Sequence, residues 1–334
     1  MDGEHDIARR TVLMSAGVGL MAAATPARAE DAKSGEIWSH EYWAPKGNIK
    51  LSLWRKRLAA PKPGEKRPVL FLVHGSSFST RTSYDLHVPG DTDYSTMNLF
   101  AREGYDVWTM DHDGYGYSQS SGNNSDIASG VEDLKAAVAV VVKETGQQKI
   151  HFYGPSSGSI RAGAYAVVEP ERVDRLVLAA FTYKGKDSVE MDRRRKRVEE
   201  LRANPRRKRD ANMIRSVYTR DGHAEAYDPA LIEAIVAAEM KHGDTIPSGT
   251  YLDMAANLPL VDPKKVKSPV LMLRGEHDGN STNDDLLDFY RQLPNGDRQF
   301  VILPHTAHSL GYSKNRHLLW YAVTSFLAAP TPVA

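Results

Sequence analysis

Residues 69–73 read Val-Leu-Phe-Leu-Val, an unbroken apolar run that follows Pro68 and ends at His74-Gly75. Successive side chains of a strand point to opposite faces, so a strand is apolar throughout only where both of its faces are buried. Helices that connect parallel strands cover a sheet in this way. The run therefore predicts an interior strand of an α/β fold.

The rest of the chain alternates strand-like and helix-like segments. Residues 36–44 and 48–57 predict an opening hairpin around Pro45-Lys46-Gly47. Further strands are expected at 105–110, 150–153, 175–180, 270–274 and 299–303, and helices near 96–103, 127–144, 157–168 and 316–328. This alternation predicts a mostly parallel central sheet flanked by helices.

Composition excludes several classes of protein. The 334 residues carry a formal net charge of +1, which gives no reason to expect a nucleic-acid partner. Cysteine is absent, so disulfides, thiolate metal sites and a cysteine nucleophile are excluded. No stretch of the expected mature chain is long and apolar enough to span a membrane. The oligomeric state is not predicted.

The N-terminus has the features of a bacterial export signal. Arg9-Arg10 opens an uncharged stretch that runs to Ala27, and Ala27-Arg28-Ala29 has the small-x-small form of a cleavage site. We therefore expect residues 1–29 to be a twin-arginine signal peptide, and the protein to be periplasmic or secreted. A general secretory signal or an uncleaved anchor is the alternative, because Ala8 and Val12 depart from the usual twin-arginine pattern.

One motif points to chemistry. Gly154-Pro155-Ser156-Ser157-Gly158 matches G-x-S-x-G and lies between an expected strand and an expected helix. Such a sharp turn holds its central residue in a strained conformation and needs very small neighbours two positions away. The glycines frame Ser156 rather than Ser157, so Ser156 is the predicted nucleophile; an ordinary glycine-rich turn is the alternative.

A serine hydroxyl needs a base to take its proton, and the base needs a carboxylate to orient it. His305 and His308 both follow the last expected strand, and Glu276 and Asp278 both follow the strand before it. The loop must turn inward through Thr306-Ala307, which favours His308. The shorter carboxylate beyond Gly275 favours Asp278. The order Ser156, Asp278, His308 is the nucleophile, acid, histidine order of such enzymes.

The remaining part is an oxyanion hole, which holds the negative oxygen that forms during acyl transfer. We expect its donors to be the backbone N–H groups of Ser157 and Ser76. Ser157 directly follows the nucleophile, and Ser76 lies in the turn after the apolar run at 69–73.

Together these motifs resemble the α/β-hydrolase fold superfamily, in its serine-esterase and lipase-like part. The resemblance covers about residues 36–328, through L-V-H-G-S-S, M-D-H-D-G-Y-G-Y-S, G-P-S-S-G, R-G-E-H-D and H-T-A-H-S. Ser156 stands where related dehalogenases and epoxide hydrolases use Asp. Ser159 stands where a further glycine often follows, but serine is also small.

The resemblance implies a helical cap inserted late in the sheet. We expect the core at 30–182 and 262–334 and the cap at 183–261. From Asp192 to Arg220 the chain has 12 basic and 4 acidic side chains, a local charge of +8. These belong either to a solvated helix face or to a rim that attracts anionic substrates or an anionic surface.

The rest of the cap leaves placements open. Residues 229–241 fit an amphipathic helix that either lines the pocket or packs in a core. Tyr183, Tyr218 and Tyr251 are candidates to face substrate, without an assigned place.

Asp111-His112-Asp113 offers residue types that bind metals. The resemblance instead implies a structural loop in which Asp111 hydrogen-bonds backbone around the catalytic turn. No H-E-x-x-H or similar ligand set occurs in the sequence, so we expect neither a metal nor a cofactor.

The predicted function is hydrolysis of a small carboxylic ester, or of a lactone or thioester, through an acyl-enzyme intermediate. The fold does not fix the reaction, so amide or carbon–carbon cleavage stays open. A non-catalytic binding protein on the same scaffold is the alternative from another class.

Overall fold

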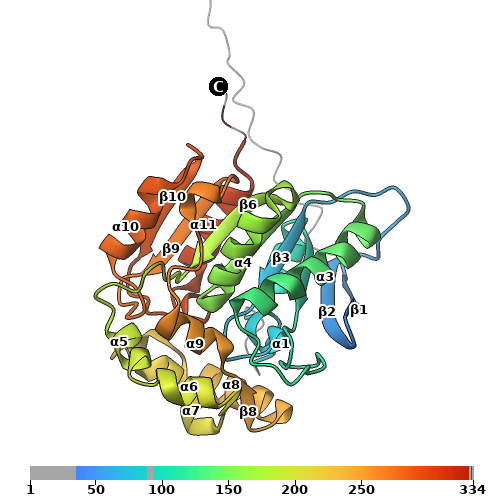
Figure 1. The fold of residues 1–334 in the computed structure, drawn as a ribbon. Helices are drawn as coiled ribbons and strands as arrows, with labels where there is room; N and C mark the ends of the chain where they lie inside the picture. The colour runs from blue at the N-terminus through green and yellow to red at the C-terminus, as the bar shows by residue number, and fades with distance from the viewer. Residues whose placement is uncertain (1–34, 89–93, 331, 333–334) are drawn as a thin grey trace, which may run out of the picture.

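The computed structural model describes residues 35–88, 94–330 and 332. Figure 1 shows one twisted sheet with helices packed on it, and the strand order is β1-β2-β4-β3-β5-β6-β9-β10. The strands are β1 (Ile37–Lys46), β2 (Ile49–Leu58), β3 (Val69–Val73), β4 (Asp106–Met110), β5 (Ile150–Pro155), β6 (Val173–Ala179), β9 (Val270–Gly275) and β10 (Arg298–Leu303). β2 pairs antiparallel with β1 and β4, and the pairs from β4 to β10 are parallel, which confirms the predicted α/β-hydrolase fold class.

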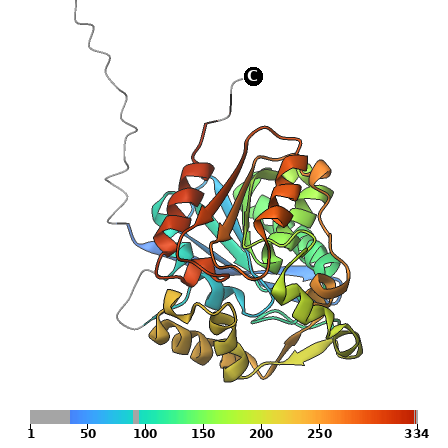
Figure 2. The same cartoon turned by 90° about the vertical axis from the view of Figure 1, so that its left-hand side faces the viewer.

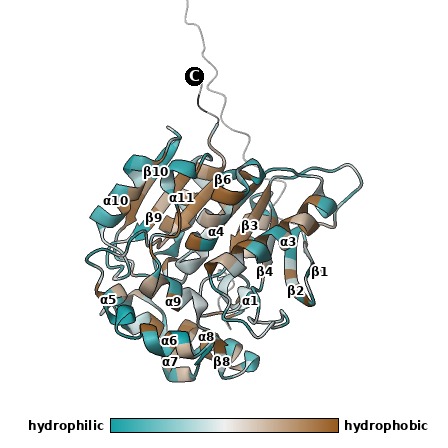
Figure 3. Cartoon of the chain, in the orientation of Figure 1, coloured by the Kyte–Doolittle hydropathy of each residue, from teal (hydrophilic) through white to brown (hydrophobic). Residues whose placement is uncertain are grey.

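Helices cover both faces of this sheet. One buried cluster joins the sheet to α3 (Ile127–Thr145), α4 (Ser157–Val168) and α10 (Asn283–Gln292). A second cluster, on the opposite face, joins it to α2 (Thr96–Arg102) and α11 (Arg316–Leu327). β3 lies between them with all five residues buried, as its apolar run predicts. In Figure 3 the hydrophobic colour is concentrated on central strands such as β3 and β6, while α10 is largely hydrophilic.

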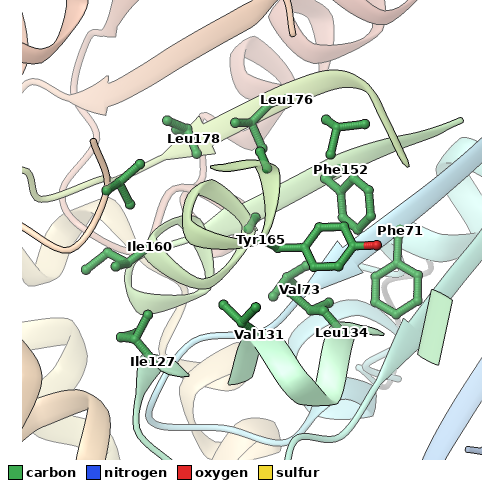
Figure 4. Packing of buried hydrophobic residues seen from close by; sticks show 14 of the residues in the cluster. Phe71, Val73, Ile127, Val131, Leu134, Phe152, Ile160, Tyr165, Leu176 and Leu178 are labelled. Carbon is green, nitrogen blue, oxygen red and sulfur yellow. The ribbon is translucent and has the colours of Figure 1, made fainter. Parts of the chain in front are cut away.

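Helix α3 illustrates how local signals set these elements. It begins after Asp126, whose side chain accepts the N–H of Ser129 as an N-cap, and it ends at Gly146 in the left-handed region (φ 70°). Ile127, Val131 and Leu134 recur at helical spacing on its buried side. Figure 4 shows these side chains packed against α4 and the strands beneath.

Residues 183–261, which we call the cap segment, lie at one end of the sheet, at the bottom of Figures 1 and 2. The segment contains α5 (Val189–Arg195), α6 (Val198–Ala203), β7 (Arg206–Lys208), α7 (Ala211–Thr219), α8 (Pro229–Glu239), β8 (Thr245–Pro247) and α9 (Gly249–Ala256). Short α1 (Thr80–Tyr84) lies on the core side, and 3-10 turns occur at Pro170–Arg172, Ala224–Ala226, Met240–His242, Pro263–Lys265 and Leu310–Tyr312. The outer limits of 183 and 261 stay a prediction.

The apolar side of α8 packs in a core. Leu231, Ile235 and Val236 belong to a third buried cluster, which also holds Phe78 of the core and Tyr218 of α7. The sequence left open whether this helix lines the pocket or packs in a core, and the structure shows that it packs in a core.

Two expectations concern export and membranes. The expected signal peptide at residues 1–29 lies outside the described residues. Within the described part of the chain, no helix combines the length and apolar character that crossing a bilayer requires.

Candidate active site

Ser156 occupies the sharp turn between β5 and α4. Its backbone has φ 56° and ψ −128°, a conformation that side-chain-bearing residues rarely adopt. Its N–H donates to the carbonyl O of Ala179 on the neighbouring strand at 2.9 Å, which holds the strained residue in place. The serine is therefore fixed at the carboxyl edge of the sheet and at the N-terminal end of α4.

The two glycines that frame Ser156 are required by close backbone contacts. A Cβ on Gly154 would lie 2.4 Å from the carbonyl O of Gly158, and one on Gly158 would lie 2.1 Å from the carbonyl O of Val73. Both distances are far below a van der Waals contact. The spacing of the motif thus follows from the packing of α4 onto β5 and β3.

The structure brings together the three predicted triad residues. The hydroxyl of Ser156 donates to Nε2 of His308 at 2.9 Å, and Nδ1 of His308 donates to Oδ1 of Asp278 at 2.9 Å. His308 follows β10 and Asp278 follows β9, so both loops lie at the sheet edge where Ser156 lies. A hydroxyl, an imidazole and a carboxylate in line can move a proton off the serine.

Asp278 is 2% exposed, and its environment keeps it ionised. Burial alone would raise the pKa of its carboxyl group, but His308 and the N–H of Asn280 outweigh burial and lower that pKa. An ionised carboxylate only accepts hydrogen bonds, so the shared proton is on Nδ1 of His308. This tautomer leaves the lone pair of Nε2 facing Ser156.

The competing residues lie on the outer surface. The side chain of His305 is 82% exposed, that of Glu276 is 46% exposed, and Glu276 accepts the backbone N–H of His305 at 2.8 Å. With His277 they form the group of described residues whose ligand-type atoms lie close enough to hold a metal ion, within 4.8 Å of one another.

Sequence reasoning did not single out Asn280. Its side chain is fully buried, and its amide Nδ2 donates to Nε2 of His308 at 3.1 Å, the same nitrogen that Ser156 approaches. A signal was present, because Asn280 follows the predicted acid Asp278 by two positions in the same loop.

The two predicted oxyanion donors lie on adjoining turns. Ser157 is the first residue of α4, so its N–H has no acceptor within the helix. Ser76 lies on the turn after β3, and its hydroxyl is 2.5 Å from the hydroxyl of Ser157 and accepts from Thr250 of α9 at 2.8 Å. This hydroxyl contact holds the two turns side by side beside Ser156.

Asp111 hydrogen-bonds the backbone of two segments near the Ser76 turn. Its Oδ1 accepts the N–H of Thr80 at 2.7 Å and its Oδ2 accepts that of Tyr117 at 2.9 Å. Asp113 bonds Ser121 instead, so the carboxylates of this stretch are used in loop contacts. The arrangement agrees with the structural interpretation of this loop.

A pocket opens above Ser156 and has two chemically different regions. One region is aromatic and apolar, with Tyr84, Tyr153, Tyr312 and Trp320 among its lining residues. The other is formed by the cap segment, with Arg194, Arg220 and Tyr251. Among the described residues that line the pocket there is no carboxylate.

Of the three tyrosines without an assigned place, Tyr251 lines the pocket. Tyr183 and Tyr218 are buried in apolar clusters, at 5% and 1% exposure. The sequence did not indicate which of the three tyrosines would line the pocket and which would be buried.

Comparison with known families decides where the chain belongs. Residues 91–314, two thirds of the chain, match the family described as serine aminopeptidase, S33. The chain belongs to this family. The expected resemblance to the α/β-hydrolase superfamily is thereby confirmed at the level of family and fold.

Curated relatives match over shorter stretches. Gastric triacylglycerol lipase of Rattus norvegicus is 32% identical over 106 residues, which are 28% of this chain and 25% of the lipase. The 2-hydroxy-6-oxononadienedioate/2-hydroxy-6-oxononatrienedioate hydrolase of Paraburkholderia phymatum is 34% identical over 123 residues, 34% of this chain and 36% of that hydrolase. The chain thus spans about a quarter to a third of these relatives.

Solved structures share the fold over most of the chain. The 2-hydroxy-6-oxo-6-phenylhexa-2,4-dienoate hydrolase from Rhodococcus sp. strain RHA1 has a TM-score of 0.63 at 17% identity, covering 88% of this chain and 100% of its own. Carboxylesterase CesB from Bacillus subtilis has a TM-score of 0.63 at 19% identity, covering 88% and 93%. Likeness at this identity establishes the fold alone.

Proposed function

We propose that this protein hydrolyses a small carboxylic ester, lactone or thioester through an acyl-enzyme intermediate on Ser156. The observation that carries the proposal is the continuous hydrogen-bonded chain from Ser156 through His308 to Asp278. Ser156 and His308 line a pocket whose other lining residues include aromatic side chains and two arginines.

In the acylation step, Oγ of Ser156 attacks the ester carbonyl carbon while its proton passes to Nε2 of His308. The negative oxygen of the tetrahedral intermediate is held by the N–H groups of Ser76 and Ser157. The imidazolium is stabilised by Asp278 and then gives its proton to the leaving alcohol, which breaks the ester bond. The acyl group stays on Ser156.

Deacylation repeats these steps with water in place of Ser156. His308 takes a proton from the water molecule, hydroxide adds to the acyl carbon, and the proton is returned to Ser156 as the acid leaves. The result is one carboxylic acid and one alcohol for each water consumed.

The family's description names an aminopeptidase, but the pocket favours an ester. An aminopeptidase must bind a free terminal ammonium group, which requires an acceptor of negative charge. Arg194 and Arg220 line this pocket instead, and both repel a cation. Carboxylic esters need no such group.

Of the two alternatives, one has specific support. The relatives and structural neighbours include hydrolases named for dienedioate and dienoate substrates, so carbon–carbon cleavage on the same triad is the second candidate. A non-catalytic binding protein is disfavoured because the nucleophile, base and acid are all within hydrogen-bond distance.

The test is a screen of p-nitrophenyl esters of increasing acyl length, followed by lactones, thioesters and aminoacyl p-nitroanilides. Ser156→Ala should lower kcat by about 10⁴-fold or more. Ser157→Ala keeps the backbone N–H and should cost less than about 10-fold, the scale of one side-chain hydrogen bond. Equal losses in the two variants contradict the assignment of Ser156.

We also propose that the chain is exported by a twin-arginine signal, on the basis of Arg9-Arg10 and the Ala27-Arg28-Ala29 site. Replacing both arginines with lysine should strand the precursor in the cytoplasm of a bacterial host. Normal periplasmic accumulation would instead show a general secretory route.

A further inference from the structure

Three arginines from different parts of the cap segment converge on one phenol. Cζ of Arg207, on β7, lies 3.9 Å from the ring centroid of Tyr251, and Cζ of Arg194, on α5, lies 4.4 Å from it. The charge of Arg220, directly after α7, acts on the same phenol, and Arg194, Arg220 and Tyr251 line the pocket above Ser156. The three are separated in sequence, so it is the packing of the cap that gathers them.

Their charge is only partly neutralised. Glu190 contacts Arg194 at 3.2 Å and Arg220 at 3.7 Å, and it also lies 3.7 Å from the exposed Arg193, so one carboxylate is shared by three guanidinium groups. Within the described residues, Arg207 has no carboxylate within salt-bridge distance. The Nε atoms of Arg207 and Arg220 are buried without a hydrogen-bond partner. Buried donors of this kind are costly unless something else accepts from them.

Most other arginines of the cap segment have a carboxylate partner of their own. Arg195 pairs with Asp192, Arg197 with Glu200, Arg202 with Glu199, and Arg215 with Glu233, all on exposed surface. Arg209 is buried, but Glu239 pairs with it at 2.5 Å. Most of the basic stretch is thus a solvated or paired face, and an unbalanced positive charge remains in the pocket.

The positive charge of these arginines changes the pKa of Tyr251. Burial alone would raise the pKa of its phenol, but Arg207, Arg194 and Arg220 outweigh burial and lower it to about 6. Few environments draw a phenol's pKa so far down, because several cations must act on it together.

The cluster lies beside the reaction centre. Nη2 of Arg207 donates to the carbonyl O of Ser76 at 3.0 Å, and the hydroxyl of Tyr251 is 3.5 Å from that of Ser77. Ser76 and Ser77 belong to the turn that lies beside Ser156, and both line the pocket. An anion held here would therefore lie within one small molecule's length of the serine.

We propose that Arg194 and Arg220, which line the pocket, form a subsite for an oxyanionic group of the substrate, a carboxylate or a phosphate, and that Arg207 adds its charge from its place against Tyr251. The subsite rests on the proposed ester hydrolysis and specifies its substrate class: a small ester with an anionic group on one part and an apolar part for the aromatic region. Guanidinium groups suit this task, because their planar donors match carboxylate and phosphate oxygens.

The test compares two methyl esters that differ in one group. Monomethyl glutarate carries a carboxylate, and methyl glutaramate carries a neutral amide of similar size; the succinate and adipate pairs extend the series. The measured quantity is the ratio of kcat/KM for the acid to that for the amide, followed by methanol release. The wild-type ratio should exceed about 10, since charge-assisted hydrogen bonds give about a 10- to 100-fold gain.

Arg220→Gln should lower this ratio by about 10-fold, and Arg207→Gln provides a second variant should the first fail to fold. Arg202→Gln is the matched control, because Arg202 is 57% exposed and pairs with Glu199 on the surface. It should leave both the ratio and the activity unchanged. A wild-type ratio near one throughout the series, or a ratio that Arg207→Gln and Arg220→Gln do not alter, overturns the proposal.

A second readout does not depend on turnover. Glutarate should slow the labelling of Ser156 by a fluorophosphonate more than glutaramide does, and inorganic phosphate used alone distinguishes a phosphate from a carboxylate preference. No protection by either anion overturns the subsite while ester hydrolysis stands. Failure of Ser156 to react at all, with no ester hydrolysed, instead overturns the proposed function.

Discussion

Nε2 of His308 lies 2.9 Å from Oγ of Ser156. The same imidazole donates to Asp278, whereas His305 and Glu276 contact each other on the surface. His308→Ala should therefore remove the base and lower kcat by about 10³-fold or more. Asp278→Asn should lower it by about 10⁴-fold by favouring the wrong tautomer.

The matched controls are His305→Ala and Glu276→Gln, which should each retain substantial activity in the same ester assay. An enzyme that is active as His308→Ala and inactive as His305→Ala would show that the loop after β10 presents the other histidine in solution.

The subsite predicts an unusual pH dependence. Below about pH 6 the phenol of Tyr251 is neutral, and above it the phenolate offsets part of the arginine charge. A substrate carboxylate is ionised on both sides of this pH. The acid-to-amide ratio of kcat/KM should therefore be highest below pH 6 and fall as the pH rises through it.

Using the ratio cancels every pH effect on the shared catalytic steps, because these act on both esters alike. The charges that act on Tyr251 come from Arg194 and Arg197 on α5 and its end, Arg207 on β7 and Arg220 after α7; Glu190 of α5 contacts two of these arginines, and His308 of the core lines the same pocket. Tyr251→Phe should remove the pH dependence of the ratio. A ratio that is flat in the wild-type enzyme, or unchanged in shape by Tyr251→Phe, contradicts this role for the phenol.

Gly158 allows α4 to pack onto β3. A methyl group there would overlap the carbonyl O of Val73 at 2.1 Å, so Gly158→Ala should shift the first turn of α4 and lower the free energy of unfolding by about 1–3 kcal/mol or more. Activity should fall with it, since Ser156 and Ser157 begin this helix. Urea denaturation and ester hydrolysis measure the two effects.

Gly296→Ala is the control for that substitution, because nothing lies within 4 Å of its added Cβ. Its effect on stability should stay within about 0.5 kcal/mol. If both variants have the same stability and activity, the close approach of α4 and β3 does not constrain the turn at Ser156.

Glu239 ties the cap segment to the core. Its carboxylate accepts both the N–H and the hydroxyl of Ser79 at 2.7 Å, and it pairs with buried Arg209. Glu239→Gln leaves that guanidinium buried without its counter-charge, which should destabilise the protein by about 3–5 kcal/mol in urea denaturation.

Glu233→Gln is the surface counterpart, because Glu233 is 57% exposed and pairs with Arg215. Its cost should be under about 1 kcal/mol. Equal stability of the two variants would indicate that the Arg209–Glu239 pair is relaxed or hydrated in solution.

The sheet could be predicted because each buried strand carries its own signal. The apolar run at Val69–Val73 indicates a buried strand, and the glycine spacing around Ser156 indicates a sharp turn. Both are local features of the sequence. The loops after β9 and β10 then meet at one sheet edge by topology, which is why two candidate residues in each loop could be ranked.

The cap segment could not be predicted in the same detail. β7 and β8 have three residues each and no apolar run, and they pair although α7 and α8 lie between them in the sequence. Which of the 12 basic side chains between Asp192 and Arg220 face the pocket depends on that packing. Arg194 and its exposed neighbour Arg195 are indistinguishable in the sequence, although one contacts Tyr251 and the other Asp192.

The most direct test of the account is covalent labelling. The protein is treated with a fluorophosphonate and digested, and the modified residue is located by mass spectrometry. We expect one adduct per chain on Ser156, with labelling slowed strongly in His308→Ala and abolished in Ser156→Ala. An adduct on Ser157 or elsewhere, or an unreactive protein, would contradict the assignment of Ser156 as the activated nucleophile.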